Sequence, residues 1–301
     1  MPEGLHKDRG FYRIGYRAWV FEFLSKGTTL CGRRFSAWSG AMAGMMYAKT
    51  HPDVVQVVVR NLGLLENRAF STTEASRVFA NFGRTMSDYF WLGGQSREAG
   101  YALAEVEADL ANFQKLCSGS TGAILATGHY GLFEFGALVL GHLGYPISIV
   151  THAEPTRSLS QWRADYRARW GAATIELGTD AFSSLRAVEA IEAGRLTAML
   201  VDRPTSGRSL LAPLKGGTAS FSMSPALLSW MTGCKVVPVT VRRLPTGRYA
   251  IRSGEAVQAD RSQPRDIAIR ECSLHMAQAL VGDFQRDPLQ WYHFEPLTTG
   301  R

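Results

Sequence analysis

Apolar residues in the first ~115 positions recur at helical spacing, and runs of β-branched residues are scarce there. This pattern predicts helices over residues 11–25, 33–48, 53–65, 73–91 and 102–116. Ser71, three residues before Glu74, predicts the cap of the fourth helix. The first helix interleaves aromatic residues with Arg13 and Arg17. Such a helix either lies in a membrane interface or packs on the core of its own protein.

After Gly122, short apolar runs rich in β-forming residues alternate with helical stretches. The runs predict strands over 123–127, 147–151, 174–177, 196–201, 235–242 and 249–251. The intervening stretches predict helices over 133–143, 158–169, 182–193, 225–232 and 266–284. This alternation predicts an α/β core with a mostly parallel sheet flanked by helices. We expect residues 1–116 to form a helical part that packs on an α/β core of residues 117–301, as one integrated domain.

Composition and charge narrow the class of protein. The 301 residues are 46% apolar, which excludes a disordered, collagen-like or coiled-coil chain. Four widely spaced cysteines indicate reduced thiols rather than a disulfide framework. We see no apolar run of ~20 residues and no secretory signal, so we expect a protein kept inside the cell. The net charge of +7 leaves nucleic acid, an anionic membrane or an acidic carrier open as partners.

The segment Gly128-His129-Tyr130-Gly131-Leu132-Phe133-Glu134 follows the first predicted strand of the core. Functional sites of open α/β sheets collect just beyond the carboxyl ends of strands. Glu134 falls in the first turn of the next predicted helix, so its carboxylate can fold back to the His129 imidazole. A carboxylate on one ring nitrogen frees the other to take a proton from a hydroxyl group. The alternatives are a loop histidine beside a helix-start acid, and a metal site that His152 and Glu154 would complete.

Asp202 and Arg203 follow another predicted strand, at the same edge of the sheet as His129. This pair is either a structural salt bridge or a group that positions substrate. Two arginine-rich stretches, within residues 157–169 and 242–252, are either solvated faces or phosphate-binding groups. The sequence has no GxSxG elbow, no Walker A motif and no nucleic-acid-binding module. Their absence disfavours a serine hydrolase, a P-loop nucleotide-binding protein and a nucleic-acid-binding protein.

In its His-X4-Glu motif the chain resembles the bacterial lipid A late acyltransferase family, which includes the phosphatidylinositol mannoside acyltransferases. These belong to the lysophospholipid acyltransferase superfamily. The motif here is His129 to Glu134, and collinear segments extend the resemblance over about residues 50–296. Those segments are Val59-Arg60-Asn61-Leu62, residues 71–82, Arg167-Ala168-Arg169-Trp170-Gly171, Gly194 to Asp202-Arg203, residues 224–239, Pro288, Gln290-Trp291 and Phe294. The family's usual membrane-spanning first helix has no counterpart in this sequence.

The resemblance implies a glycerolipid acyltransferase-like fold that moves a fatty acyl chain from an acyl thioester to a hydroxyl of a glycolipid or phospholipid. The thioester would be that of acyl carrier protein or coenzyme A, with no metal or other cofactor. The alternatives are a non-catalytic lipid- or carrier-binding protein and an acyl thioesterase. The resemblance also implies peripheral binding to the anionic cytoplasmic face of the inner membrane, without nucleic acid. The implied general base is His129 with Glu134 as its partner, and the implied substrate-binding residues are Arg167, Arg169, Asp202, Arg203, Tyr130 and Gly131.

Overall fold

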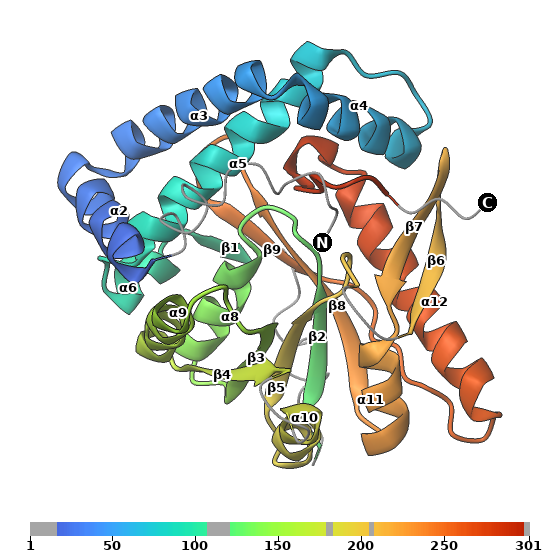
Figure 1. Ribbon diagram of the computed structural model, residues 1–301. Coiled ribbons are helices and arrows are strands. Elements are labelled where there is room, and N and C mark those ends of the chain that lie inside the picture. Colours follow the sequence, from blue (N-terminus) through green and yellow to red (C-terminus); the bar gives the residue numbers. More distant parts are fainter. Residues whose placement is uncertain (1–16, 107–120, 179–182, 205–207, 298–301) are drawn as a thin grey trace.

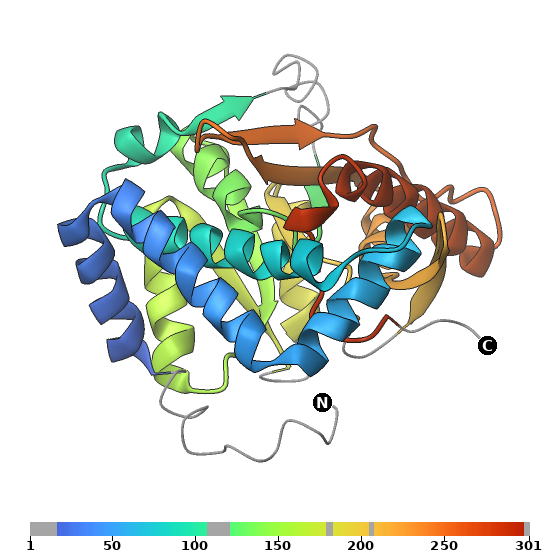
Figure 2. The ribbon, with the colours of Figure 1, turned by 90° about the horizontal axis from the view of Figure 1, so that it is seen from above.

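The computed structural model describes residues 17–106, 121–178, 183–204 and 208–297. The N-terminal helices are α2 (Ala18–Cys31), α3 (Arg33–Thr50), α4 (Pro52–Glu66), α5 (Thr72–Leu92) and the short α6 (Arg97–Tyr101). The predicted Ser71 cap is confirmed: Ser71 and Glu74 form a reciprocal capping box that satisfies free N–H groups at the start of α5. Helix α3 lies along the outside of α5 in both views (Figures 1 and 2).

A seven-stranded sheet forms the centre of the molecule, with strand order β1-β9-β8-β2-β5-β3-β4. Only the β8–β9 pair is antiparallel among these strands as described. The predicted α/β fold with a mostly parallel sheet is therefore confirmed. The strands are β1 (Ala104–Val106), β2 (Ala123–Thr127), β3 (Ile147–His152), β4 (Ala172–Leu177), β5 (Leu196–Leu200), β8 (Lys235–Arg243) and β9 (Tyr249–Ser253).

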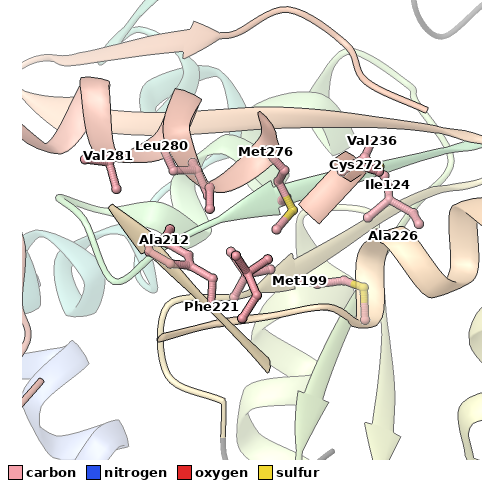
Figure 3. Packing of buried hydrophobic residues seen from close by; sticks show 14 of the residues in the cluster. Ile124, Met199, Ala212, Phe221, Ala226, Val236, Cys272, Met276, Leu280 and Val281 are labelled. Atoms are coloured by element: carbon pink, nitrogen blue, oxygen red, sulfur yellow. The ribbon is translucent and has the colours of Figure 1, made fainter. Parts of the chain in front are cut away.

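Helices cover both faces of the sheet, which is why the central strand β2 is buried along its whole length. On one face, α10 (Ser183–Glu192), α11 (Ser224–Thr232) and α12 (Arg265–Phe284) pack over Ile124 and Met199. Figure 3 shows this core, with side chains from α12, α11 and the sheet meeting between the layers. On the other face, α5, α8 (Phe133–His142) and α9 (Arg157–Arg169) form a second apolar cluster around Phe135.

Two features of the fold were not expected from the sequence. The predicted helix 102–116 is wrong where it can be checked, because residues 104–106 form β1, which pairs with β9; residues 107–116 lie outside the described residues. An antiparallel hairpin of β6 (Ser209–Leu214) and β7 (Gly217–Ser222) adds a small second sheet under α12. Of the predicted first helix, residues 11–16 lie outside the described part, and α2 continues to Cys31.

The described part of the chain contains no helix that is both long and apolar enough to cross a membrane.

The C-terminal segment returns to the carboxyl edge of β2 and holds the loop that carries His129. Gly131 donates its N–H to the carbonyl of Gln290 at 2.9 Å, and Tyr292 donates to the carbonyl of His129 at 2.8 Å. The short 3-10 helix Pro288–Gln290 precedes this pairing. The loop is therefore fixed on both sides, by the sheet and by the C-terminal segment.

Candidate active site

His129 meets Asp202 because β2 and β5 are neighbouring parallel strands. The two strands run in register, with Thr127 opposite Leu200, and each of the two polar residues lies two positions beyond its strand. Their side chains therefore emerge at the same edge of the sheet. The His129 Nδ1 lies 2.8 Å from Asp202 Oδ1. The sequence placed both residues at this edge, but it did not predict that they would bind each other.

Asp202 is a buried carboxylate held in one orientation by three hydrogen bonds. Besides the His129 ring, the His129 backbone N–H donates to Oδ2 at 3.0 Å, and the Trp291 indole N–H donates to the same oxygen at 2.9 Å. Burial raises the pKa of Asp202, but the His129 ring, which hydrogen-bonds to the carboxylate, and the charge of Arg203 lower it by more, so the net pKa lies below the ordinary range. Asp202 is therefore ionised at neutral pH.

An ionised carboxylate accepts hydrogen bonds and donates none, so Nδ1 of His129 must carry the proton that joins the two groups. The unprotonated nitrogen of the neutral ring is then Nε2. The His129 side chain is 24% exposed, and its Nε2 makes no hydrogen bond within the described part of the chain. Nε2 is thus available to accept a proton from a bound hydroxyl group. Phe133 packs edge-on against the ring and limits its movement.

Glu134 does not bind His129, so the expected contact between them is wrong. Its Oε1 accepts a hydrogen bond from the Arg167 guanidinium at 2.6 Å, and Arg163 lies 3.6 Å from the same oxygen. Burial raises the pKa of Glu134, but Arg167 and Arg163 together hold it below its ordinary value. Glu134 leaves the first turn of α8 on the side that faces α9, and this orientation directs it to the two arginines.

Arg167 and Arg169 were expected to bind substrate, and the structure gives each another partner. The Arg167 side chain is only 3% exposed and is occupied by Glu134, so it cannot reach a substrate phosphate in this arrangement. Arg169 donates to the carbonyl of Gly93, the residue that ends α5. Arginine at this position stabilises the free carbonyls of a helix end.

Tyr130 and Gly131 support the loop rather than face a substrate. The Tyr130 ring is 1% exposed and stacks on Phe284 with ring centroids 5.3 Å apart. Gly131 has φ +53°, and a Cβ atom there would lie 1.9 Å from the carbonyl oxygen of Val241. Only glycine fits this close approach, so Gly131 is required by the turn itself.

Arg203 remains close to the site. Its guanidinium donates to the carbonyl of Tyr292, and its charge contributes to the lowered pKa of Asp202. The Arg203 Nε is buried and has no hydrogen-bond partner in the structure as described. Arg203 is therefore a cation beside Asp202 that has unused hydrogen-bonding capacity.

Trp291 and His293 also belong to the site, although neither was expected to bind substrate or to act in catalysis. Trp291 binds Asp202, and the His293 ring lies 5.2 Å from the Trp291 ring. Burial lowers the pKa of His293, while Asp202 raises it, and the net effect is a lowered pKa. The buried Asn61 amide holds this segment by donating to the carbonyls of His293 and Glu295. The collinear motifs around Asn61 and Trp291 were the signal that these segments matter.

The residues considered for a metal site do not converge. Glu154 pairs with Arg163 at 3.1 Å. Across the described ranges, no three His, Cys, Asp or Glu side chains are grouped so that they could hold a metal ion.

The fold and the site together define an α/β protein with a carboxylate-bound histidine at the carboxyl edge of a parallel sheet. The model of the bacterial lipid A biosynthesis acyltransferase family matches residues 75–298. The chain belongs to this family, and it is an acyltransferase. A comparison with curated protein sequences found no match.

Proposed function

We propose that this acyltransferase moves a fatty acyl chain from an acyl thioester to a hydroxyl group of a lipid A-like glycolipid. The donor is the thioester of acyl carrier protein or coenzyme A. His129 is the general base, and Asp202 is its partner. The observation that carries the proposal is the 2.8 Å contact between His129 Nδ1 and a buried, ionised Asp202, which leaves Nε2 free to accept a proton.

The reaction follows from this geometry in two proton transfers. Nε2 of His129 takes the proton of the acceptor hydroxyl while the hydroxyl oxygen forms a bond to the thioester carbonyl carbon. The Asp202 carboxylate stabilises the imidazolium that results, as the acid of a catalytic triad does. The tetrahedral intermediate then expels the thiolate, which receives the proton from His129. The products are the O-acyl lipid and the free thiol, and no acyl-enzyme is formed.

Two groups near His129 are suited to the negative charge that develops on the carbonyl oxygen. Helix α8 begins at Phe133, four residues after His129, and no described side chain caps its N-terminus. The N–H groups and the dipole of a helix start favour an anion. The Arg203 guanidinium offers a second source of positive charge at the same edge.

The surface charge supports the choice of partners. A net charge of +7 attracts both an acidic acyl carrier protein and an anionic lipid surface. We propose that the enzyme binds peripherally to the cytoplasmic face of the inner membrane, where an acyl thioester made in the cytoplasm and a membrane glycolipid meet.

The test is acyl transfer from a radiolabelled acyl thioester to a detergent-dispersed lipid A precursor. We expect His129→Ala to lower kcat by about 10²–10⁴-fold and to keep the wild-type circular dichroism spectrum. Release of free fatty acid without an acylated lipid would instead indicate a thioesterase. Near-normal transfer by His129→Ala would exclude His129 as the base.

A further inference from the structure

Helix α3 presents a stripe of large apolar side chains to the outside of the molecule. Phe35, Trp38, Met42, Met45 and Met46 are all exposed, with Trp38 at 60% and Met46 at 62%. Their spacing of three, four, three and one residues places them on one face of the helix. Exposed apolar patches of this kind mark a surface that binds something apolar.

The opposite face of α3 is made of small residues that touch α5 backbone to backbone. A Cβ atom added at Gly40 would lie 2.4 Å from the Gly83 carbonyl oxygen, and one added at Gly44 would lie 2.1 Å from that of Phe79. A helix on a water-exposed surface normally buries its large apolar residues. Helices whose outer face contacts lipid have the opposite arrangement, with small residues toward the protein and large apolar residues outward.

Helix α2 also carries large apolar side chains that are exposed. Trp19, Phe23 and Leu30 are 56%, 69% and 89% exposed. Together with the five α3 side chains they form what we call the α2–α3 face. An open apolar groove of about 640 Å³ lies between α2, α3 and α5 and is bordered by Phe23 and Phe35.

Basic side chains flank the α2–α3 face. Residues 17–50 contain five Lys or Arg and one acid, Glu22. The Arg33 guanidinium forms a bidentate ion pair with the buried Asp88 carboxylate, within the protein. Lys26, Arg34 and Lys49 are exposed, and no ion pair joins them to any residue in the described ranges. Arg34 and Lys49 bracket the α3 stripe at its two ends.

We propose that the α2–α3 face docks on an anionic lipid bilayer, with its aromatic and Met side chains among the acyl chains and its Lys and Arg among the headgroups. This deepens the proposed function, on which it rests for the presence of the substrate in a membrane. A second copy of the chain is a poorer occupant, because it would bring like charges together and because lysine is depleted in protein interfaces. Amphipathic surfaces with Trp, Phe and Lys or Arg bind membrane interfaces.

The test is co-sedimentation of the full chain with vesicles of phosphatidylcholine containing about a third phosphatidylglycerol. We expect wild type to bind, and the double variant Met42→Glu/Met46→Glu to bind at least about tenfold more weakly, because two carboxylates must enter the apolar layer. The matched control is Met231→Glu/Ile267→Glu, which changes two other exposed apolar side chains, each 48% exposed, by the same charge. We expect this control to bind like wild type.

Equal binding of both double variants would overturn the proposal. So would a lipid-free dimer, measured by light scattering, that Met42→Glu/Met46→Glu dissociates, because the face would then join two copies. Vesicle binding requires no catalysis, so it is independent of the proposed reaction. Acyl transfer in detergent, where no bilayer must be bound, should stay within about twofold of wild type in both double variants. Wild-type protein that binds vesicles but transfers no acyl chain in detergent would count against the proposed reaction and leave the docking face intact.

Discussion

His129 depends on a carboxylate that lies 73 positions away in the chain, while the acid five positions away has another task. The two acids are both buried and both have a lowered pKa, but their partners differ. Asp202 binds a histidine that opens toward solvent. Glu134 binds Arg167 and thereby joins α8 to α9. Asp202 therefore orients the base, and Glu134 anchors α8 to α9.

Substituting the two acids should therefore affect different properties, namely catalysis for Asp202 and stability for Glu134. We expect Asp202→Asn to lower kcat by about 10²–10⁴-fold, because the ring loses the carboxylate that fixes its tautomer and stabilises its positive charge. We expect Glu134→Gln to lower the free energy of unfolding by about 3 kcal/mol, because it leaves Arg167 buried without a counter-charge. Steady-state kinetics and urea denaturation of both variants measure these effects. A larger loss of kcat for Glu134→Gln than for Asp202→Asn would contradict the assignment.

Trp291 is a positioning residue, since it acts on Asp202 and not on substrate. Trp291→Phe keeps an aromatic ring but removes the N–H that binds Asp202 Oδ2. We expect kcat to fall by about tenfold with KM unchanged, because one of three hydrogen bonds that orient the carboxylate is lost. Trp170→Phe is the matched control, as Trp170 is also fully buried but lies in the cluster around α8 and α9. Equal kcat values for the two variants would rule out a positioning role for Trp291.

At the scale of elements, the α3–α5 contact shows how glycine sets the distance between two helices. Gly40 and Gly44 on α3, with Gly83 on α5, let the two backbones approach until no side chain fits between them. Close packing of this kind gives the two helices an extensive contact. It also leaves the large residues of α3 no place in the interior, so they face outward.

Gly40→Ala should thus destabilise the protein. The added methyl group would meet the Gly83 carbonyl oxygen, and we expect a loss of about 1–3 kcal/mol in the free energy of unfolding. Gly27→Ala in α2 is the control, because nothing lies within 4 Å of the added Cβ and alanine favours a helix. We expect this variant to be at least as stable as wild type. Urea denaturation of the two variants measures these changes. A Gly40→Ala variant as stable as wild type would show that the two helices can move apart at little cost in free energy.

At the scale of the whole molecule, the buried acids tie distant parts of the chain together. Asp88 on α5 binds Arg33 of α3 and accepts a hydrogen bond from the Tyr249 hydroxyl of β9 at 2.6 Å. Asp202 joins the loops after β2 and β5 to the C-terminal segment. The Asp202 carboxylate must stay ionised to keep its partners, so the stability of the whole fold depends on pH.

We expect the free energy of unfolding to fall between about pH 5 and pH 3. The pKa values of Asp202 and Glu134 are lower in the folded protein than their ordinary values of about 3.9 and 4.3. In this range the unfolded chain therefore binds more protons than the folded one, and acid favours unfolding. Thermal unfolding of wild type and of Asp202→Asn/Glu134→Gln across this range measures the effect. The double variant should show a flatter dependence, and an equally steep one would contradict our reading of the two acids.

Local patterns predicted most elements well. The capping box at Ser71, the strand at 123–127 and the helix at 133–142 follow from residues that are neighbours in sequence. The failures involve elements that depend on distant partners. Residues 104–106 extend only because β9 pairs with them, and the hairpin at 209–222 forms beneath α12. The sequence also did not predict that the large apolar side chains of α3 face outward. The inner face of α3 carries Ala and Gly, so the helix lacks the usual contrast between a polar and an apolar side.

The sequence by itself determined the α/β class, the acyltransferase family and the position of His129 and Asp202 at one edge of the sheet. These follow from periodicity, from collinear motifs and from the rule that parallel strands end together. The tertiary structure decided which acid binds His129. Hydrogen-bond partners depend on the direction in which each side chain leaves its element, and that direction is set by packing between segments far apart in the chain. Glu134 faces α9 and its arginines, whereas Asp202 faces His129 and Trp291.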